Sequence, residues 1–235
     1  MISDVTARPT LLLIHGAWHG SWCWNNLRAA LDVEGIESRT LDLPSAGGQS
    51  GIAEDARVIR GAIDALEGRP VVVVTHSYGG IPVSQAIAGT SNVVRVVYLA
   101  AFQLDVGESL LGYIGAPAAS DPREMEPVPD DPRALFYADL PHLEAEEAVA
   151  HLVPQSARSF AEPLGQAGWR DVPSTYIVCQ QDRALPAVHQ EALATRAAEV
   201  YRMAGDHSPF LSKPSELAAL LTKIALQSRP DAALG

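Results

Sequence analysis

Three side chains of this sequence could together carry out nucleophilic catalysis: Ser77, Asp182 and His207. A serine hydroxyl is a weak nucleophile at its ordinary pKa, so it needs a base within hydrogen-bond reach and a carboxylate that orients the base. Ser77 lies in the string THSYGG, Asp182 lies in QQDR, and His207 lies in GDHS. Each is the third residue of its string. This set of residue types predicts acyl transfer through a covalent intermediate.

The surroundings of Ser77 are typical of a nucleophile elbow, a very tight turn from a strand into a helix. Such a turn lifts the serine above the edge of the sheet, and small neighbours let the strand and the helix approach each other. The start of the helix favours developing negative charge. Thr75 stands where the usual pattern has glycine, so the match is incomplete. The alternative is a serine that only caps the helix.

Asp182 and His207 each follow a short apolar run. Because open parallel sheets place their ligand crevice at the carboxyl ends of the strands, both side chains are expected at the same crevice. Asp105 also follows an apolar run and stays a second candidate for the acid. Asp206, the neighbour of His207, is interpreted as a carboxylate that shapes the loop.

Two backbone amides could hold the negative charge of a tetrahedral intermediate. The N–H of Tyr78 follows the nucleophile, and the N–H of Ala17 lies in the string HGAWHG after the first apolar run. Gly16 would let the backbone approach closely there, although it could equally be a plain turn glycine. Each donor of this kind contributes about 3 kcal/mol to transition-state stabilisation.

The elements that must position these residues can be predicted from hydrophobic periodicity. Apolar runs alternate with stretches of helical period, which predicts a parallel sheet with crossover helices. Several runs are apolar at consecutive positions, as in strands buried on both faces. Strands are predicted at 10–14, 36–41, 71–75, 93–100, 174–179 and 200–203. Helices are predicted at 21–34, 52–66, 79–89, 187–197 and from 214 onward.

The alternation is interrupted once, at about 103–169, where prolines crowd an acidic stretch. The second part of this insertion, 132–164, carries apolar residues among acids and is expected to form short helices over the sheet. The sequence therefore predicts a single domain, 1–235, whose core comprises 1–102 and 170–235.

Charge and composition exclude several classes of function. The 235 residues carry a net charge of −11, which repels nucleic acids and anionic membranes. The start of the chain lacks a leader pattern and no run approaches the length of a membrane span, so a cytoplasmic protein is expected. Cys23 and Cys179 are predicted to be buried thiols. Histidine and cysteine spacings typical of a metal site are absent.

Strings spread along the chain resemble one known family. They are HGAWHGSWCW at 15–24, LDLP at 41–44, HSYGG at 76–80, YLAAF at 98–102, QD at 181–182, GDH at 205–207 and LSKP at 211–214. In this order they closely resemble the plant methylesterase and hydroxynitrile lyase branch of the α/β-hydrolase superfamily, whose bacterial relatives are small esterases.

The resemblance implies an α/β-hydrolase fold, with a mostly parallel six-stranded sheet flanked by helices and a small helical cap. It implies Ser77 as nucleophile, His207 as base and Asp182 as the orienting acid, with Ala17 and Tyr78 as oxyanion donors. In the lyases a threonine follows the first histidine of the signature and a lysine follows the catalytic histidine. This chain has Gly16 and Ser208 there, which disfavours cyanohydrin cleavage.

The sequence thus predicts a carboxylic ester hydrolase that acts on a small-molecule ester without a cofactor, as a monomer or homodimer. A ligand receptor, or a specialised pathway enzyme such as a lactone or carbon–carbon hydrolase, stays open as the alternative on the same fold. His19 is interpreted as a structural, hydrogen-bonded residue of the signature. Candidate pocket walls are Phe102, Phe136, Tyr137, Phe160, Trp169 and Phe210.

Overall fold

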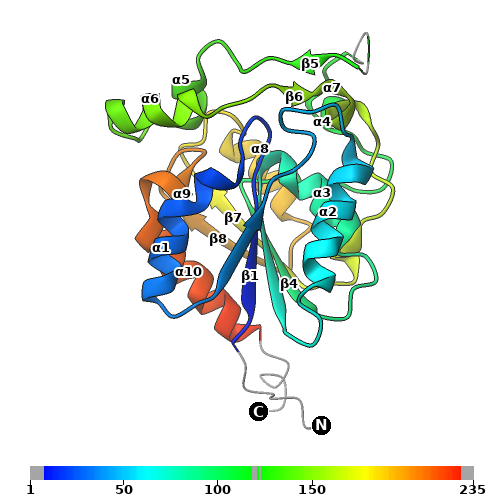
Figure 1. The fold of residues 1–235 in the computed structure, drawn as a ribbon, viewed down its shortest axis with the longest axis vertical. Coiled ribbons are helices and arrows are strands. Elements are labelled where there is room, and N and C mark those ends of the chain that lie inside the picture. Colours follow the sequence, from blue (N-terminus) through cyan, green and yellow to red (C-terminus); the bar gives the residue numbers. More distant parts are fainter. Residues whose placement is uncertain (1–7, 118–120, 122, 229–235) are drawn as a thin grey trace.

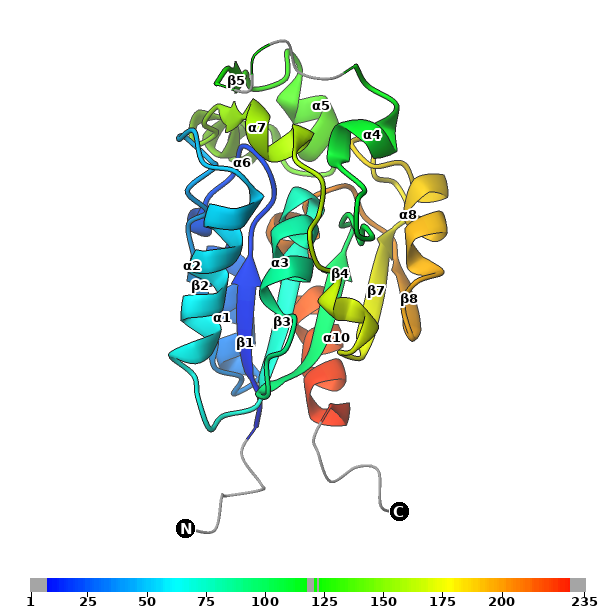
Figure 2. The same cartoon turned by 90° about the vertical axis from the view of Figure 1, so that its right-hand side faces the viewer.

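A parallel β-sheet with helices on both faces forms the centre of the molecule (Figures 1 and 2). The computed structural model describes residues 8–117, 121 and 123–228. The first residues of the chain, which bear on the prediction of no leader, lie outside these ranges. The strands of the sheet are β1 (Thr10–Ile14), β2 (Ser38–Leu41), β3 (Val71–His76), β4 (Val93–Leu99), β7 (Ser174–Cys179) and β8 (Glu199–Met203).

The strand order in the described residues is β2-β1-β3-β4-β7-β8, and every pair is parallel. The predicted six-stranded α/β fold is therefore confirmed, with a sheet that is entirely parallel. Five strands begin within one residue of their predicted start, whereas β2 begins two residues late. The reason is local, because the N–H of Ile36 bonds to the carbonyl of Leu31 and closes the turn that ends the preceding helix.

Alternate strand residues pack against two different layers of helices. Leu11 and Leu13 of β1 pack against the layer formed by α1 (Asn25–Val33), α9 (Pro209–Ser212) and α10 (Pro214–Gln227). The short helix η1 (Ser21–Trp24) directly precedes α1 in this layer. Leu12 and Ile14 belong to the layer with α2 (Ile52–Asp64), α3 (Gly80–Ala86) and α8 (Ala187–Ala194). Every residue of β1, β3 and β7 is buried, which explains their consecutive apolar residues.

The predicted apolar stripe of the second helix packs on the sheet. Ile52, Ala56, Ile59 and Ile63 are all buried, and α2 ends at Asp64, two residues before the predicted end. One charged side chain, Asp55, is buried on the same face.

The described helices and strands in the first part of the segment between β4 and β7 lie over the carboxyl ends of the sheet strands (Figures 1 and 2). They are α4 (Leu110–Ile114), β5 (Met125–Glu126), α5 (Pro132–Phe136), α6 (His142–Ala150), β6 (Gln155–Ser156) and α7 (Ala157–Ala161). The short helix η3 (Gly168–Arg170) follows and packs at the C-terminal end of α3, before β7 begins. The helices α5 to α7 fall where short helices were predicted. Helix α4 and the antiparallel pair β5–β6 were not predicted. A five-residue helix and two-residue strands are too short to show a hydrophobic period.

The remaining sequence expectations concern cysteines, metals and membranes. Cys23 and Cys179 are buried free thiols, as predicted. Within the described residues no group of three or more histidine, cysteine, aspartate or glutamate side chains is arranged to hold a metal ion. The helices in that part of the chain are all too short or too polar to span a bilayer.

Candidate active site

Ser77 lies on a strained turn between β3 and α3. The strand ends at His76, the short helix η2 (Ser77–Gly79) follows, and α3 begins at Gly80. Ser77 has φ +51°, in the left-handed region that residues with a Cβ atom rarely adopt. Such strain persists only where the surroundings hold the backbone, and here the N–H of Phe102 bonds to the carbonyl of Ser77 at 3.0 Å. This is the backbone that the elbow prediction requires.

Two glycines after Ser77 make the turn possible. A Cβ atom on Gly79 would lie 2.5 Å from the carbonyl oxygen of His15, and one on Gly80 would lie 2.6 Å from that of Phe102. The unusual Thr75 fits because its hydroxyl lies only 2.9 Å from the position of a Gly79 Cβ atom, so the missing side chain at 79 leaves room for it. The departure from the elbow pattern is thus accommodated by close backbone packing.

This close packing predicts opposite effects for two glycine-to-alanine changes. Gly79→Ala is expected to lower the free energy of unfolding by about 1–3 kcal/mol, because the new methyl group meets rigid backbone. Gly61→Ala, in the interior of α2 with nothing within 4 Å of a Cβ atom, should raise it by about 0.5–1 kcal/mol. Urea unfolding of both variants measures the difference. Destabilisation of the Gly61 variant, or none of the Gly79 variant, would contradict this account.

His207 and Asp182 are hydrogen-bonded to each other in a buried environment. His207 Nδ1 lies 2.7 Å from Asp182 Oδ2, and their side chains are 3% and 0% exposed. The carboxylate also accepts the N–H groups of Ala184 and Leu185 at 2.8 Å and the Gln190 amide at 2.9 Å. Because Asp182 is an acceptor, the hydrogen of the neutral imidazole sits on Nδ1 and leaves a lone pair on Nε2.

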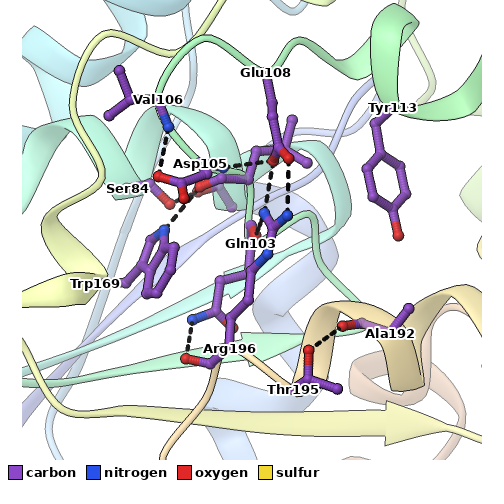
Figure 3. A network of polar contacts seen from close by, with 12 residues as sticks. Ser84, Gln103, Asp105, Val106, Glu108, Tyr113, Trp169, Ala192, Thr195 and Arg196 are labelled. Carbon is purple, nitrogen blue, oxygen red and sulfur yellow. Dashed lines mark hydrogen bonds and ion pairs between the residues drawn. The ribbon is translucent and has the colours of Figure 1, made fainter.

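Asp105, the rival candidate for the acid, belongs to a different network of polar contacts (Figure 3). Its Oδ2 lies 2.5 Å from Arg170 Nη2, and this hydrogen bond lowers the pKa of Asp105 below its usual value. In the same network Glu108 forms a two-pronged ion pair with Arg196, at 2.6 and 2.9 Å. The structure therefore pairs Asp182, and not Asp105, with His207.

Asp206 contributes to the shape of the loop that carries His207. Its Oδ2 accepts the N–H of Ala138 at 2.6 Å, and its own N–H donates to Asp139 Oδ2 at 3.1 Å. Burial raises the pKa of the Asp206 carboxyl. These contacts tie the loop after β8 to the segment after α5, in agreement with the interpretation of Asp206 as a loop-shaping carboxylate.

The histidines of the first loop are structural. His15 Nδ1–H donates to the Gly16 carbonyl at 2.8 Å, and its Nε2 accepts a backbone N–H from the loop after β2 at 2.9 Å. His19 Nδ1–H donates to the Ala17 carbonyl at 2.8 Å, and its Nε2 accepts the Tyr137 hydroxyl at 2.8 Å. Burial lowers the pKa of His15, and lowers that of His19 to about 3. Both rings are therefore neutral supports of the loop that carries Ala17.

The two candidate oxyanion donors line the same cavity as Ser77 and His207. In the described part of the chain, neither the Ala17 nor the Tyr78 backbone N–H has a hydrogen-bond acceptor. A Cβ atom on Gly16 would lie 2.8 Å from Ser77 Cβ, so this glycine allows the loop to approach the serine. Free amides at a buried site are costly unless something binds to them.

The cavity has a volume of about 150 Å³ and a largely apolar wall. Of the predicted walls, Phe102, Phe136 and Phe160 line it. The complete lining is Ala17, Trp18, Ser77, Tyr78, Phe102, Leu110, Ile114, Phe136, Phe160, Ala184, Leu185 and His207. Trp18, Leu110, Ile114, Ala184 and Leu185 were not predicted, because they lie in loops or in one short helix and show no periodicity.

The other predicted wall residues have different roles. Tyr137 bonds to His19, the Trp169 indole donates to the Leu104 carbonyl at 2.8 Å, and Phe210 packs among rings at the base of the first loop. Aromatic side chains in such sequences pack in the core as often as they line a pocket, and nothing in their spacing distinguishes the two.

Comparison with known proteins covers nearly the whole chain. The profile of the Alpha/beta hydrolase family matches residues 11–220. Probable hydrolase R7 from Phoma sp. is 31% identical over 240 residues, which cover 93% of this chain and 98% of that protein. Putative methylesterase 11, a chloroplastic protein of Arabidopsis thaliana, is 30% identical over 246 residues, covering 91% of this chain and 63% of that protein.

A solved structure shows the same similarity. The crystal structure of the methylesterase MES16 from Arabidopsis matches with a TM-score of 0.79 and 26% sequence identity. The match covers 93% of this chain and 99% of that chain.

Proposed function

We propose, from the premise that this chain belongs to the alpha/beta hydrolase family and is a carboxylic ester hydrolase, that it cleaves small esters through Ser77, His207 and Asp182. The matches to two methylesterases confirm the predicted resemblance to that branch. The observation that carries the proposal is the 2.7 Å hydrogen bond between His207 and Asp182, beside a cavity that His207 shares with Ser77.

In the first half of the reaction, Ser77 Oγ attacks the ester carbonyl carbon while His207 Nε2 takes its proton. The ester carbonyl oxygen becomes an oxyanion, and the free N–H groups of Ala17 and Tyr78 donate hydrogen bonds to it. The intermediate then collapses, the bond to the alkoxy group breaks, and His207 returns the proton to the departing alcohol. The product of this half is an acyl group on Ser77.

In the second half, water attacks the acyl carbonyl and His207 again serves as the base. Asp182 holds the imidazole in the required tautomer and stabilises the positive charge that forms on it. The second tetrahedral intermediate collapses, the bond from the acyl carbon to Ser77 Oγ breaks, His207 returns the proton to Ser77 Oγ, and the carboxylic acid leaves. Water is the second substrate of this half, and the side chains and backbone amides of this chain supply the other groups that the steps use.

The segment at 103–169 acts, in this proposal, as a cap that limits the size of the substrate. Leu110 and Ile114 of α4, Phe136 of α5 and Phe160 of α7 contribute to the cavity wall. A cavity of about 150 Å³ accommodates a group roughly as large as benzene. Among the described residues that line the cavity, His207 and Tyr78 are the ionisable ones. A charged acyl group would therefore lose its hydration without gaining a partner.

A panel of p-nitrophenyl esters tests this function and its substrate class. We expect hydrolysis of the acetate and butyrate, and a kcat/KM for the butyrate that exceeds that of the anionic hemisuccinate at least ~10-fold, because burial of an unpaired charge is costly. The decanoate should be hydrolysed poorly, because its chain exceeds the cavity. The butyrate and the hemisuccinate are matched, since they have the same chain length and differ in charge.

The panel separates the function from the substrate class. Equal rates for butyrate and hemisuccinate would refute the apolar class and leave the esterase in place. Absence of hydrolysis of every ester by the folded protein would refute the esterase and favour the ligand-receptor alternative.

A further inference from the structure

Asp55 on α2 is a buried carboxylate that the proposed reaction does not use. It is fully inaccessible to solvent. Its Oδ1 accepts the N–H of Ser45 at 3.0 Å, and its Oδ2 accepts the Ser45 hydroxyl at 2.5 Å and the Tyr78 hydroxyl at 2.8 Å. The residue that supplies one candidate oxyanion amide is therefore anchored through its own side chain to Asp55.

The same network reaches the second candidate amide. Gln155 of β6 donates its amide to the Ser45 hydroxyl at 2.8 Å and to the Ser159 hydroxyl at 2.9 Å. Its Oε1 accepts the N–H of Trp18 at 3.2 Å, one residue after Ala17.

The backbone at Trp18 needs this support. Trp18 has φ +60°, and its carbonyl accepts the N–H of Val153 at 2.9 Å. Both backbone polar groups of this residue are thus held by the segment that contains β6, which keeps a strained conformation in place. Ser45, Gln155 and Trp18 form a continuous path from Asp55 to the loop of Ala17.

We propose that Asp55 is a positioning residue of the oxyanion hole, whose ionised carboxylate holds the Tyr78 amide directly and the Ala17 amide through Ser45, Gln155 and Trp18. This inference rests on the proposed function, because it assigns to Asp55 the geometry of the two donors used there. Asp55 does not touch the substrate and acts only through its neighbours.

The charge of Asp55 decides which way the hydrogen bonds run. An ionised carboxylate only accepts, so both hydroxyls donate to it. A protonated carboxyl must donate one hydrogen itself, and one of the hydroxyls then has to turn away. Because both hydroxyls contact Oδ2, protonation there loosens the anchor of Tyr78 or of Ser45.

Asp55 titrates in a range where enzyme assays are possible. Burial raises the pKa of Asp55 to about 6, although the hydrogen bonds from Ser45 and Tyr78 oppose the shift. The charged groups nearby are Glu54 on α2, which adds to the rise, Arg158 on α7 and Glu162 just after α7. Arg158 pairs with both Glu162 and Glu54. Tyr78 is the titratable group in direct contact, and its pKa is raised by burial, so it stays protonated.

The experiment compares Asp55→Asn with Asp64→Asn on p-nitrophenyl butyrate. Asparagine has the shape of the protonated carboxyl and donates as it does, so at about pH 8 the Asp55 variant should lose at least ~10-fold in kcat with KM within ~2-fold. Asp64 is a matched control on the same helix, 63% exposed and paired only with Arg60 in the described structure. Its variant should keep the wild-type kcat.

The pH profile distinguishes positioning by a charge from simple structural damage. The ratio of wild-type to Asp55→Asn kcat should fall from ~10 at about pH 8 toward 1 at about pH 5, because the wild-type carboxyl becomes neutral there. The contribution of the catalytic base cancels in this ratio. A ratio of 1 at high pH, or one that does not change with pH, would overturn the inference.

A second variant keeps the inference testable if Asp55→Asn does not fold. Tyr78→Phe removes only the hydroxyl that Asp55 accepts, and kcat should fall ~5-fold or more with an unchanged KM. A wild-type kcat in Tyr78→Phe would count against the inference. Failure of the wild-type protein to hydrolyse any ester would refute the proposed function first, and the inference with it. An active wild type with unaffected variants would refute the inference alone.

Discussion

Replacing Ser77 with alanine is expected to lower kcat for ester hydrolysis by about 10⁴- to 10⁶-fold, because no other group can form the acyl intermediate. The variant should fold normally, since alanine has the same Cβ atom and meets the same strain at φ +51°. KM should change little, because the hydroxyl reacts but contributes little to binding. Progress curves with p-nitrophenyl acetate and thermal melting measure both properties.

Fluorophosphonate labelling shows whether the same serine is activated. Intact mass and peptide mapping should reveal one adduct on Ser77 in the wild type and none in Ser77→Ala. Ser208→Ala is the matched control, because Ser208 is buried next to His207 and its hydroxyl has no partner in the described residues. Persistent labelling or turnover in Ser77→Ala would exclude Ser77 as the nucleophile.

The second large effect is expected from Asp182→Asn, which should lower kcat by about 10³- to 10⁴-fold. Asparagine can keep the acceptor for the Ala184 and Leu185 amides on Oδ1. Its NH₂ group then faces His207 Nδ1, where the carboxylate accepted a hydrogen bond. Two donors cannot face each other, so the imidazole takes the opposite tautomer and its Nε2 can no longer accept the serine proton.

Asp105→Asn is the control that separates the two candidate acids. Asp105 pairs with Arg170 in a partly exposed position, with side chains 28% and 58% exposed, so its loss should change kcat by less than ~2-fold. Steady-state kinetics of the two variants, with circular dichroism to check folding, decide between them. A large loss in Asp105→Asn with a normal Asp182→Asn would reverse the assignment.

Much of the fold could be predicted because its signals are local. The strand Ser174–Cys179 has the bounds predicted from its apolar run, and the stripe that begins at Ile52 is buried on α2 as predicted. Consecutive apolar residues and a helical period reflect the surroundings of neighbouring residues, which the order of the chain already contains. The pair β5–β6 carries no such signal, because each strand has two residues.

The hydrophobic pattern of α2 contains a signal for Asp55 that the sequence predictions did not use. It lies three residues after Ile52 and four before Ile59, on the apolar face of α2. A charged residue on a buried face predicts a buried polar partner. The sequence could not name that partner, because Tyr78 and Ser45 reach Asp55 from other elements.

The sequence by itself determined the six strands of the sheet, the main helices that flank it, the tight turn at Ser77 and the candidate reactive residues. Only the tertiary structure decided that Asp182 rather than Asp105 meets His207, and which side chains enclose the cavity. The physical reason is that periodicity and turn chemistry depend on residues near one another in the chain. Contacts between loops after β3, β7 and β8 depend instead on the order of the strands and on how the covering segment packs.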